Sequence, residues 1–571
     1  MLSISCAKQK GRSRFSSPGV TGDFEWLRPL YSLPIDRSGN PLAFDATTGL
    51  ITTNVASIAL PWTLGSPPGT VRNVASDGQM TTALAALARG DEIVVNAGTT
   101  LSVFDLPNIS GFDPDNAATW IIIRTSGVAS LPALSATGNP VSTGDVSFMF
   151  SVVHTSTFDS SPCIRAAASA KGYRIIGAQV TSTKSGNHED GLIRTSPDSY
   201  NDAGRTSFFT IDRCWITRTA GTGARRGISV GSDDTVIHQC RISDIDDASV
   251  DDSQGISMWE GISRVRITRN VIEAVSENIL GGGVGSSLTT KNPTDIEIRG
   301  NYINKKSSWS AITEVKNHIE LKKGIRVLIE GNKFVNMWQL AQDQSQIYQS
   351  NSQSGLEVAA LTKDVTCRFN QFDNIFSFVK LGWKNGTNAT EGASRMEISH
   401  CLVTSCNLGI DNSNVTFMPD VNCNDSTFRY NTTPNTHSLF YMSGGVIPLG
   451  STNWGVRCEN NISYDVTTYG IFGAGSGNET DLNIAYLNSG NWSVKRNVLL
   501  PAINTPLSAG LKATPHFNSE AANAAAIGFT NLAGGDFSLA GGSAYKGTSM
   551  DGKDPGVYWP LLQTLLSGIN P

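Results

Sequence analysis

A short pattern recurs along most of this chain and limits its fold more than any other feature. The clearest copies lie in Ile296–Phe334, which contains IEIRGNYI and VLIEGNKF. Each alternates apolar and polar residues and then places an asparagine, which predicts a β-strand followed by a turn. The copies begin at intervals of 25 to 38 residues, at Tyr173, Phe209, Thr235, Val265, Ile296, Val327, Val365, Met396, Val421, Val456 and Trp492. One unit cannot bury its apolar side but stacked units can, so the pattern predicts a solenoid.

A second strand is predicted in most units. Its positions two and four are mostly apolar and should face the interior, while position three should face solvent. The predicted segments are Gly227–Val230, Gly255–Met258, Asn278–Gly281, His318–Leu321, Gly355–Val358, Phe378–Leu381, Gly409–Asn412, Ser438–Tyr441 and Gly470–Gly473.

The sixth place of the first pattern predicts an internal column of asparagines. Each amide would bond to the next coil and satisfy backbone groups that the turn leaves open. The place holds Asn270, Asn301, Asn332, Asn370, Asn461 and Asn497, with Cys214, Cys240, Cys401 and Ser426 in other copies. The cysteines are interpreted as small buried hydrophobes. A disulfide between Cys401 and Cys406 is the less favoured alternative.

With this column the chain resembles the right-handed parallel β-helix proteins of the pectate-lyase-like superfamily, among them phage tailspikes and bacterial β-helix repeat proteins. The resemblance covers about residues 75–555. It implies an all-β fold, a right-handed parallel β-helix solenoid with an N-terminal helix cap, an extended N-terminal arm and a C-terminal cap. A leucine-rich solenoid is the alternative, but its Leu-x-x-Leu-x-Leu pattern is absent.

Four parts follow along the chain. Residues 1–60 are expected to be an extended arm that docks on something and is a candidate anchoring segment, or else a disordered tail. Residues 61–103 would form the N-terminal cap and first coil, including an apolar helix at Met80–Ala88. Residues 104–505 would form the β-helix, and 506–571 a C-terminal capping segment in which Tyr558–Leu566 covers the far end.

Charge and hydropathy exclude several classes of partner. The net charge is −5 and the isoelectric point is near 5.9, which argues against broad binding to nucleic acid or acidic membranes. No run of 18 apolar residues is present, so no membrane span is expected. The first residues contain no apolar core of signal-peptide length, yet the resemblance is to extracellular proteins; we therefore expect a virion or extracellular location.

The outward position of the second strand supplies the first candidate site. Stacked coils place equivalent residues about 4.8 Å apart, so Glu320 and Glu357 are predicted neighbours, with Lys380 and Asp411 next in line. Two carboxylates about 5 Å apart suit a nucleophile and an acid/base in sugar hydrolysis. They also suit Ca²⁺, with Lys322 or Lys380 as the base of a lyase. Trp259 could stack on a sugar ring, and the alternative is a solvated ladder of charges.

An acidic loop supplies the second candidate site. It contains Asp244, Asp246, Asp247, Asp251, Asp252 and Gln254, with Glu277 and Asn278 one coil later. These groups could hold calcium or bind sugar, and the favoured alternative is an exposed acidic loop.

Family motifs give only a partial match. The Trp-Ile-Asp-His run of pectate lyases and the Gly-His-Gly of polygalacturonases are absent. The stretch Glu314–Phe334 is similar to the lyase family of chondroitinase B and alginate lyases, which implies Lys323 as the base. Lys316 and His318 stand at that family's calcium positions, and Arg is missing from the next coil.

Together these features predict recognition of a surface polysaccharide, with depolymerisation by a lyase or hydrolase, by a phage tailspike-like virion protein. The alternatives are a non-catalytic structural or adhesive spike and a secreted bacterial polysaccharide lyase. The expected partners are a cell-surface polysaccharide and virion or tail proteins that the arm would bind. The resemblance also implies a homotrimer.

Overall fold

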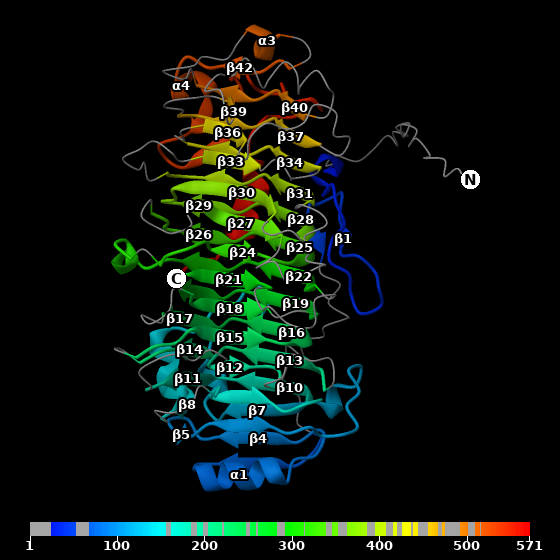
Figure 1. The fold of residues 1–571 in the computed structure, drawn as a ribbon, viewed down its shortest axis with the longest axis vertical. Helices are drawn as coiled ribbons and strands as arrows, with labels where there is room; N and C mark the ends of the chain where they lie inside the picture. The colour runs from blue at the N-terminus through cyan, green and yellow to red at the C-terminus, as the bar shows by residue number, and fades with distance from the viewer. Residues whose placement is uncertain are drawn as a thin grey trace, which may run out of the picture.

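Three long parallel sheets form a prism in the computed structural model (Figure 1). The structure describes residues 24–52, 68–155, 161–183, 191–197, 204–219, 222–246, 252–258, 261–282, 292–312, 314–338, 345–351, 362–384, 394–406, 415–419, 425–434, 438–442, 455–465, 471–473, 492–500, 509–513 and 516–571. Each turn of the chain adds one strand to the first sheet, one to the second and one to the third. The predicted all-β parallel β-helix is therefore confirmed.

The first sheet contains the strands predicted from the repeated pattern. Its described strands are β3 (Val71–Val74), β4 (Glu92–Val95), β7 (Ile121–Thr125), β10 (Lys171–Ile176), β13 (Thr206–Asp212), β16 (Ser232–His238), β19 (Ser263–Thr268), β22 (Thr294–Arg299), β25 (Gly324–Glu330), β28 (Thr362–Arg368), β31 (Ser394–Ser399), β34 (Ser426–Arg429), β37 (Val456–Glu459) and β40 (Trp492–Lys495).

The second sheet follows the turn that carries the asparagines. Its described strands are β5 (Thr100–Leu101), β8 (Phe150–His154), β11 (Ala178–Ser182), β14 (Trp215–Thr217), β17 (Arg241–Ile245), β20 (Val271–Ala274), β23 (Tyr302–Asn304), β26 (Lys333–Val335), β29 (Gln371–Asp373), β32 (Leu402–Val403), β35 (Thr432–Thr433), β38 (Ile462–Ser463), β41 (Val498–Leu499) and β42 (Ser519–Glu520).

The third sheet is built from the second strand of the sequence pattern. Its described strands are β6 (Phe104–Leu106), β9 (Ile164–Ala166), β12 (Ile193–Arg194), β15 (Arg226–Val230), β18 (Gln254–Met258), β21 (Glu277–Gly281), β24 (Ile319–Leu321), β27 (Ser345–Asn351), β30 (Ser377–Lys384), β33 (Val415–Pro419), β36 (Ser438–Met442) and β39 (Ile471–Gly473).

Smaller elements complete the described fold. Two antiparallel pairs join β1 (Ala43–Phe44) to β2 (Ile51–Thr52) and β43 (Phe529–Asn531) to β44 (Asp536–Leu539). The helices are α1 (Asp77–Ala85), α3 (Ala509–Lys512), α4 (Ala524–Ile527) and α5 (Trp559–Leu566), with short 3-10 helices at Glu25–Leu27, Ala117–Thr119, Val128–Ser130, Thr143–Phe148 and Ser307–Trp309.

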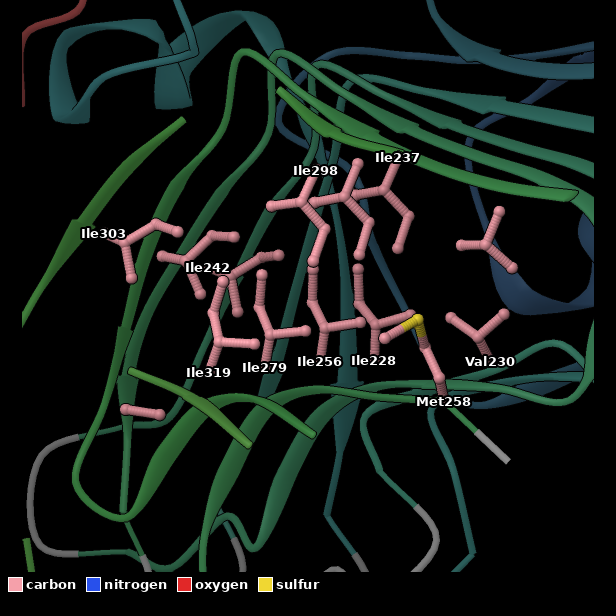
Figure 2. Close-up of a cluster of buried hydrophobic side chains, with 14 of the residues drawn as sticks. Ile228, Val230, Ile237, Ile242, Ile256, Met258, Ile279, Ile298, Ile303 and Ile319 are labelled. Carbon is pink, nitrogen blue, oxygen red and sulfur yellow. The ribbon is translucent and has the colours of Figure 1, made fainter. Parts of the chain in front are cut away.

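Apolar side chains from all three sheets meet in the interior (Figure 2). In the third sheet, Ile228, Ile256, Ile279 and Ile319 are register partners in successive coils, and all four are fully buried. These are position-two residues of the predicted second strand, so the predicted inward orientation is confirmed there. The columns bury apolar area along the whole axis, which lets one core serve a long chain.

Asparagines fix the turn between the first and second sheets. The Oδ1 atom of Asn301 accepts hydrogen bonds from the backbone N–H of Asn270 at 2.9 Å and from its Nδ2 at 3.0 Å. The Nδ2 atom of Asn301 in turn donates to the carbonyl of Ile267 and to Oδ1 of Asn332. The same pair of bonds links Asn332 to Asn370. It also links Asn431 to Asn461, Asn461 to Asn497, and Asn497 to Asn518. Cys401 stands between Asn370 and Asn431 in this column, as predicted.

One repeat was placed wrongly by the sequence pattern. The coil predicted to begin at Val421 begins its pairing at Ser426, which lies beside Val456. Asn431 therefore takes the column position predicted for Ser426. The predicted start matched an alternating segment five residues too early. Asn518 extends the asparagine column beyond the predicted repeats.

The cysteines of the described residues are all free, so the less favoured alternative of a Cys401–Cys406 disulfide is wrong.

The residue before each asparagine adopts a left-handed backbone. Its φ is +59° at Arg269, +52° at Phe369 and +55° at Tyr430, while glycines occupy the same place at Gly300 and Gly331. A non-glycine residue in this region carries strain that surrounding structure must hold. The asparagine bonds supply that constraint, because they satisfy the backbone on both sides of the bend.

The N-terminal end of the core is covered by a helix, as predicted, but the other end is covered differently from the prediction. Helix α1 begins at Asp77 and ends at Ala85, a few residues before the predicted Met80–Ala88, and its Met80 and Ala83 pack into the core. Leu511 of α3 packs at the other end, where Figure 1 shows α3 above the last coils. Helix α5 instead lies against the side of the solenoid, with Leu565 on Gly331. The prediction that Tyr558–Leu566 covers the far end is therefore wrong.

Residues 24–52 of the predicted arm dock on the chain's own first sheet (Figure 1). The backbone N–H of Leu30 donates to Glu397 at 2.7 Å, and that of Ile35 donates to Asp295 at 2.9 Å. Arg368, which is almost fully buried, donates to the carbonyls of Leu27 and Gly49. Residues 24–52, which we call the strap, therefore form hydrogen bonds with buried polar groups of the solenoid. The basic residues at positions 8–14 lie outside the described residues.

Replacing Asn332 with alanine should lower the free energy of unfolding by roughly 2–4 kcal/mol, because the Asn301 N–H and the Ile298 carbonyl lose their buried partner. Denaturant or thermal unfolding followed by circular dichroism measures the change. Asn96→Ala, at an exposed asparagine, is the matched control and should change little. Equal stability of the two variants would contradict a structural role for the column.

Replacing Leu27 with alanine should weaken the free energy of docking of the strap by about 2–4 kcal/mol, because this side chain is 1% exposed and packs with Leu561 and Leu562. Limited proteolysis should then cut residues 28–52 faster while the solenoid stays intact. Leu30→Ala is the control, since Leu30 is 42% exposed. If Leu27→Ala left the rate of cleavage in residues 28–52 unchanged, docking of the strap on the first sheet would be contradicted.

Candidate functional site

The register of the third sheet changes the first predicted site. The partner of Glu320 in the next coil is Tyr348, and the partner of Tyr348 is Lys380. Lys380 then pairs with Met418. Tyr348, and not the predicted Glu357, is thus the register partner of Glu320, and Met418, and not the predicted Asp411, is that of Lys380.

The reason for this error is a choice between two alternating segments. Ser345–Asn351 and Gly355–Val358 both suit a strand, and the first one forms β27. Sequence alternation cannot choose between them, because both satisfy the period of two. Glu357, Asp411 and Trp259 lie outside the described residues, and Lys380 lies two coils from Glu320.

A different set of carboxylates gathers at the start of the third-sheet strands. Asp252 precedes β18, Glu277 begins β21 and Glu320 lies in β24, so they come from three consecutive coils. The N-terminal ends of parallel strands lie on the same side of the sheet, which brings these groups together. Lys316 joins two of them, with its Nζ atom 3.2 Å from Asp252 Oδ1 and 3.6 Å from Glu277 Oε1.

Glu320 has its own polar partners in this cluster. Lys322 Nζ lies 3.5 Å from Glu320 Oε1, and Asn317 Nδ2 donates to Oε2 at 3.2 Å. Lys322, which was predicted as a candidate base, therefore pairs with Glu320, two residues before it in the chain. Asp252 also accepts from Arg225 at 3.2 Å.

Glu277 is the most perturbed carboxylate of the cluster. It is fully buried, and its Oε2 atom accepts from Gln254 Nε2 at 2.8 Å. Gln254 is in turn held by Arg226, whose Nε donates to Gln254 Oε1 at 2.9 Å. Burial, helped by the negative charges of Glu320 and Asp252, raises the pKa of Glu277 to about 8 in spite of the nearby lysines. At neutral pH this side chain is therefore a carboxylic acid that can give a proton.

Asp252 is perturbed in the opposite direction. Burial pushes its pKa upward, but the charges of Lys316 and Lys322 and the hydrogen bond from Arg225 outweigh that effect. The net result lowers the pKa of Asp252, so it stays ionised. Two carboxyl groups with pKa values pushed apart, one an acid and one an anion, are the pattern of a general acid working with a base or nucleophile.

Lys316 remains a cation in this setting. Burial lowers its pKa, but Glu277 and Asp252 raise it more, and the net pKa is raised. Sequence comparison placed Lys316 at a calcium position of a lyase family, and the structure shows an ammonium group between carboxylates there. Lys323, which the same comparison implies as a base, is fully buried.

Asn278 serves the interior and not the surface. Its Nδ2 donates to the carbonyls of Ile272 and Asn304, and its Oδ1 bonds to His318 Nδ1 at 3.0 Å. Its side-chain amide is therefore already bonded within the coil, and its predicted role in binding substrate stays a prediction. It anchors the strand that presents Glu277.

A buried lysine that sequence analysis did not single out also supports this strand. Lys305 is fully buried, and its Nζ donates to the carbonyls of Ala274, Val275 and Ser276, the three residues before Glu277. Burial lowers its pKa well below the usual value. A single lysine in a loop carries no pattern that would reveal this role.

The acidic loop is charge-balanced where the structure describes it. Asp244 pairs with Lys306 at 2.5 Å, and Asp246 pairs with Arg218 at 2.7 Å. Asp247 and Asp251 lie outside the described residues. Within the described part of the chain, no group of three or more His, Cys, Asp or Glu side chains is arranged to hold a metal ion. These ion pairs do not favour calcium at this loop.

Comparison with known proteins gives matches only among solved structures. No protein-family model matches the chain, and no curated protein matches its sequence. An alginate lyase from Paenibacillus sp. aligns with 13% identity and a TM-score of 0.37, covering 71% of this chain and 98% of that one. An alpha-1,3-glucanase catalytic unit from Streptomyces thermodiastaticus aligns with 14% identity and a TM-score of 0.41, covering 78% and 70%. The tailspike of Escherichia coli bacteriophage HK620 aligns with 10% identity and a TM-score of 0.39, covering 71% and 69%.

Hydropathy of the described helices adds one further observation. None of them has the length and apolar character needed to cross a bilayer. The candidate site is the group formed by Asp252, Glu277, Lys316, Glu320 and Lys322, which we call the carboxylate cluster.

Replacing Glu277 with glutamine should change how stability depends on pH. With its pKa raised from 4.5 to about 8, folded Glu277 keeps a proton that the unfolded chain loses, so its stabilising effect is complete below pH 4.5 and is lost as pH rises to about 8. The wild type should therefore lose a few kcal/mol relative to Glu277→Gln between pH 5 and pH 9. Chemical unfolding at both pH values measures this, with Glu25→Gln as an exposed control. Parallel pH profiles for wild type and Glu277→Gln would contradict the raised pKa.

Proposed function

We propose that the carboxylate cluster binds a polysaccharide and cleaves it by hydrolysis, with Glu277 as the general acid. The observation that carries this proposal is the opposite perturbation of two neighbouring carboxyl groups, one protonated and one ionised at neutral pH. Glu277 would protonate the glycosidic oxygen, and Asp252 would act as the base or nucleophile on the sugar ring. Glu320 would remain beside them as a hydrogen-bonding group.

The substrate must reach Glu277 past Lys316. Asp252 and Lys316 are partly exposed, while Glu277 has no exposed surface. We infer that sugar hydroxyls replace the Lys316 contact to Glu277, and that Lys316 then stays paired with Asp252. Displacement of this cation would also help to keep the acid protonated until the bond breaks.

Hydrolysis fits the cluster better than elimination. A lyase needs a base that removes a proton from carbon, and a lysine serves only when its pKa is lowered. The pKa of Lys316, the lysine that contacts both carboxyl groups, is raised instead, which leaves Lys322 as the candidate base of a lyase. A lyase reaction remains the alternative that the test below separates, since it gives unsaturated sugars that absorb ultraviolet light.

The wider setting follows from the same proposal. A cell-surface polysaccharide is the proposed substrate, and an extracellular or virion location would bring the protein to it. If the protein belongs to a virion, its attachment segment should lie outside residues 24–52, because these dock on its own first sheet. A trimer and a contact with tail proteins stay predictions of the same kind.

Glu277→Gln and Asp252→Asn should each reduce the release of new reducing ends from bacterial surface polysaccharides by about 100-fold or more, because each removes one proton-transfer or nucleophilic group. The rate should also fall as pH rises through about 8, where Glu277 loses its proton. Asp105→Asn is a matched control, since Asp105 belongs to the same sheet several coils away and pairs with Arg165.

The outcomes separate the candidate functions. Ultraviolet-absorbing products without a matching hydrolysis signal would indicate a lyase. Binding of polysaccharide with no cleavage, unchanged in Glu277→Gln and Asp252→Asn, would overturn the enzymatic proposal and favour an adhesive spike.

A further inference from the structure

A cavity of about 770 Å³ lies on the outer face of the first sheet, away from the carboxylate cluster of the third sheet. Its floor is made by β16, β19, β22 and β25. Its walls come from three segments distant in sequence: the strap at Leu50 and Ile51, the loop at Ala136 and Thr137, and the C-terminal residues 564–568. A cavity of this size can enclose a small organic molecule.

The floor of this cavity holds more positive than negative charge. Glu297 lies between Arg266, at 3.0 Å, and Arg299, at 3.6 Å. Glu330 likewise pairs with Arg299 and with Arg368. Glu297 and Glu330 therefore balance Arg266 and Arg299, the two arginines of this network that line the cavity.

Arg269 supplies the excess positive charge of this floor. Among the described residues, its guanidinium donates to backbone carbonyls alone, those of Thr137, Gly138, Ser567 and Gly568. The side chain lines the cavity and only 7% of the residue is exposed. Carbonyl oxygens orient the group but carry no net charge, and burial accordingly lowers the pKa of Arg269. An unneutralised charge in a low-dielectric site is costly, so an anion here would be stabilised.

The walls specify the rest of the ligand. Leu50, Ile51, Ala136 and Leu565 present apolar surface above the arginines. Arg266 uses Nε and one terminal nitrogen for Glu297, and its other terminal nitrogen has no hydrogen-bond partner among the described residues, although the residue is only 6% exposed. An anionic head group at the floor and an apolar body between the walls would satisfy both surfaces.

We propose that this cavity is a binding site for a small organic anion with an apolar body, held by Arg266 and Arg269. Because its walls combine the strap, an internal loop and the C-terminal segment, the bound anion would also tie these three segments together. The site is independent of the carboxylate cluster, and its test does not depend on catalysis.

The probe for the test is 8-anilinonaphthalene-1-sulfonate, an aromatic anion whose fluorescence rises in apolar sites. It should bind the full chain saturably with a stoichiometry near one. N-phenyl-1-naphthylamine, which has the same aromatic body without the sulfonate, should bind at least tenfold more weakly. Arg266→Gln should weaken binding of the anionic probe about tenfold or more, while Arg165→Gln, at an arginine of the third sheet, should leave it unchanged.

A second variant guards against misfolding of the first. Ala136→Trp adds bulk at the cavity wall without removing a charge, and it should block the anionic probe while circular dichroism stays that of the wild type. Equal binding of both probes, or anionic binding that persists in Ala136→Trp, would overturn the proposal, because the arginines or the cavity would then not be the site. Polysaccharide cleavage should be the same in Ala136→Trp and wild type, which separates this site from the proposed active site.

Discussion

The asparagine-bonded turn between the first and second sheets is the constraint on which the structure depends. At this turn the chain bends through a left-handed residue, and the amide of one coil satisfies the backbone of the next. The repeat of this bond fixes the distance along the axis and the register in the first two sheets. A slip of one residue would turn inward side chains outward, and the buried amides would lose their partners at the same time. The fully buried isoleucine columns of the third sheet are the result of that register.

The sequence supports the fold prediction well because the turn has a chemical signature. An alternating strand followed by asparagine recurs with little change, and the interior needs only apolar residues at alternate positions. Prediction fails where the chain offers two equivalent segments, as at Val421 against Ser426 and at Gly355–Val358 against Ser345–Asn351. Alternation decides which residues share a face, but the length of the preceding loop decides which segment pairs. The carboxylate cluster was found in part for the same reason. Asp252, Gln254 and Glu277 were predicted from their adjacent coils, and Glu320 and Lys322 from the outward positions of the second strand. Lys316 was noted only at a calcium position, and Lys305 lies in a loop that carries no pattern.

The strap covers charged side chains on the outer face of the first sheet and forms hydrogen bonds with them. The outward side chains of this sheet include Arg266, Glu297, Arg299, Glu330 and Arg368, which a solvated sheet would leave in water. In this chain the strap and α5 cover the face, and backbone carbonyls at Leu27, Gly49 and Ile51 accept the hydrogen bonds that water would otherwise supply. Polar residues on that face therefore mark a docking surface within one chain, and a count of charged residues cannot distinguish such a surface from an exposed one.

The carboxylate cluster and the arginine cavity show the same physical rule with opposite signs. In each place, charged side chains from neighbouring coils are buried close together, and burial makes a charge expensive to leave unpaired. At Glu277 the chain resolves the cost by keeping a proton on the carboxyl group, since a second anion beside Asp252 and Glu320 would be unfavourable. Arginine cannot resolve it in that way, because guanidinium keeps its proton at any ordinary pH. Carbonyl groups around Arg269 orient the charge without cancelling it, and no carboxylate of the described residues pairs with it, so an anion bound in the cavity would neutralise it. That difference explains why the acidic cluster suits proton transfer while the basic cavity suits binding.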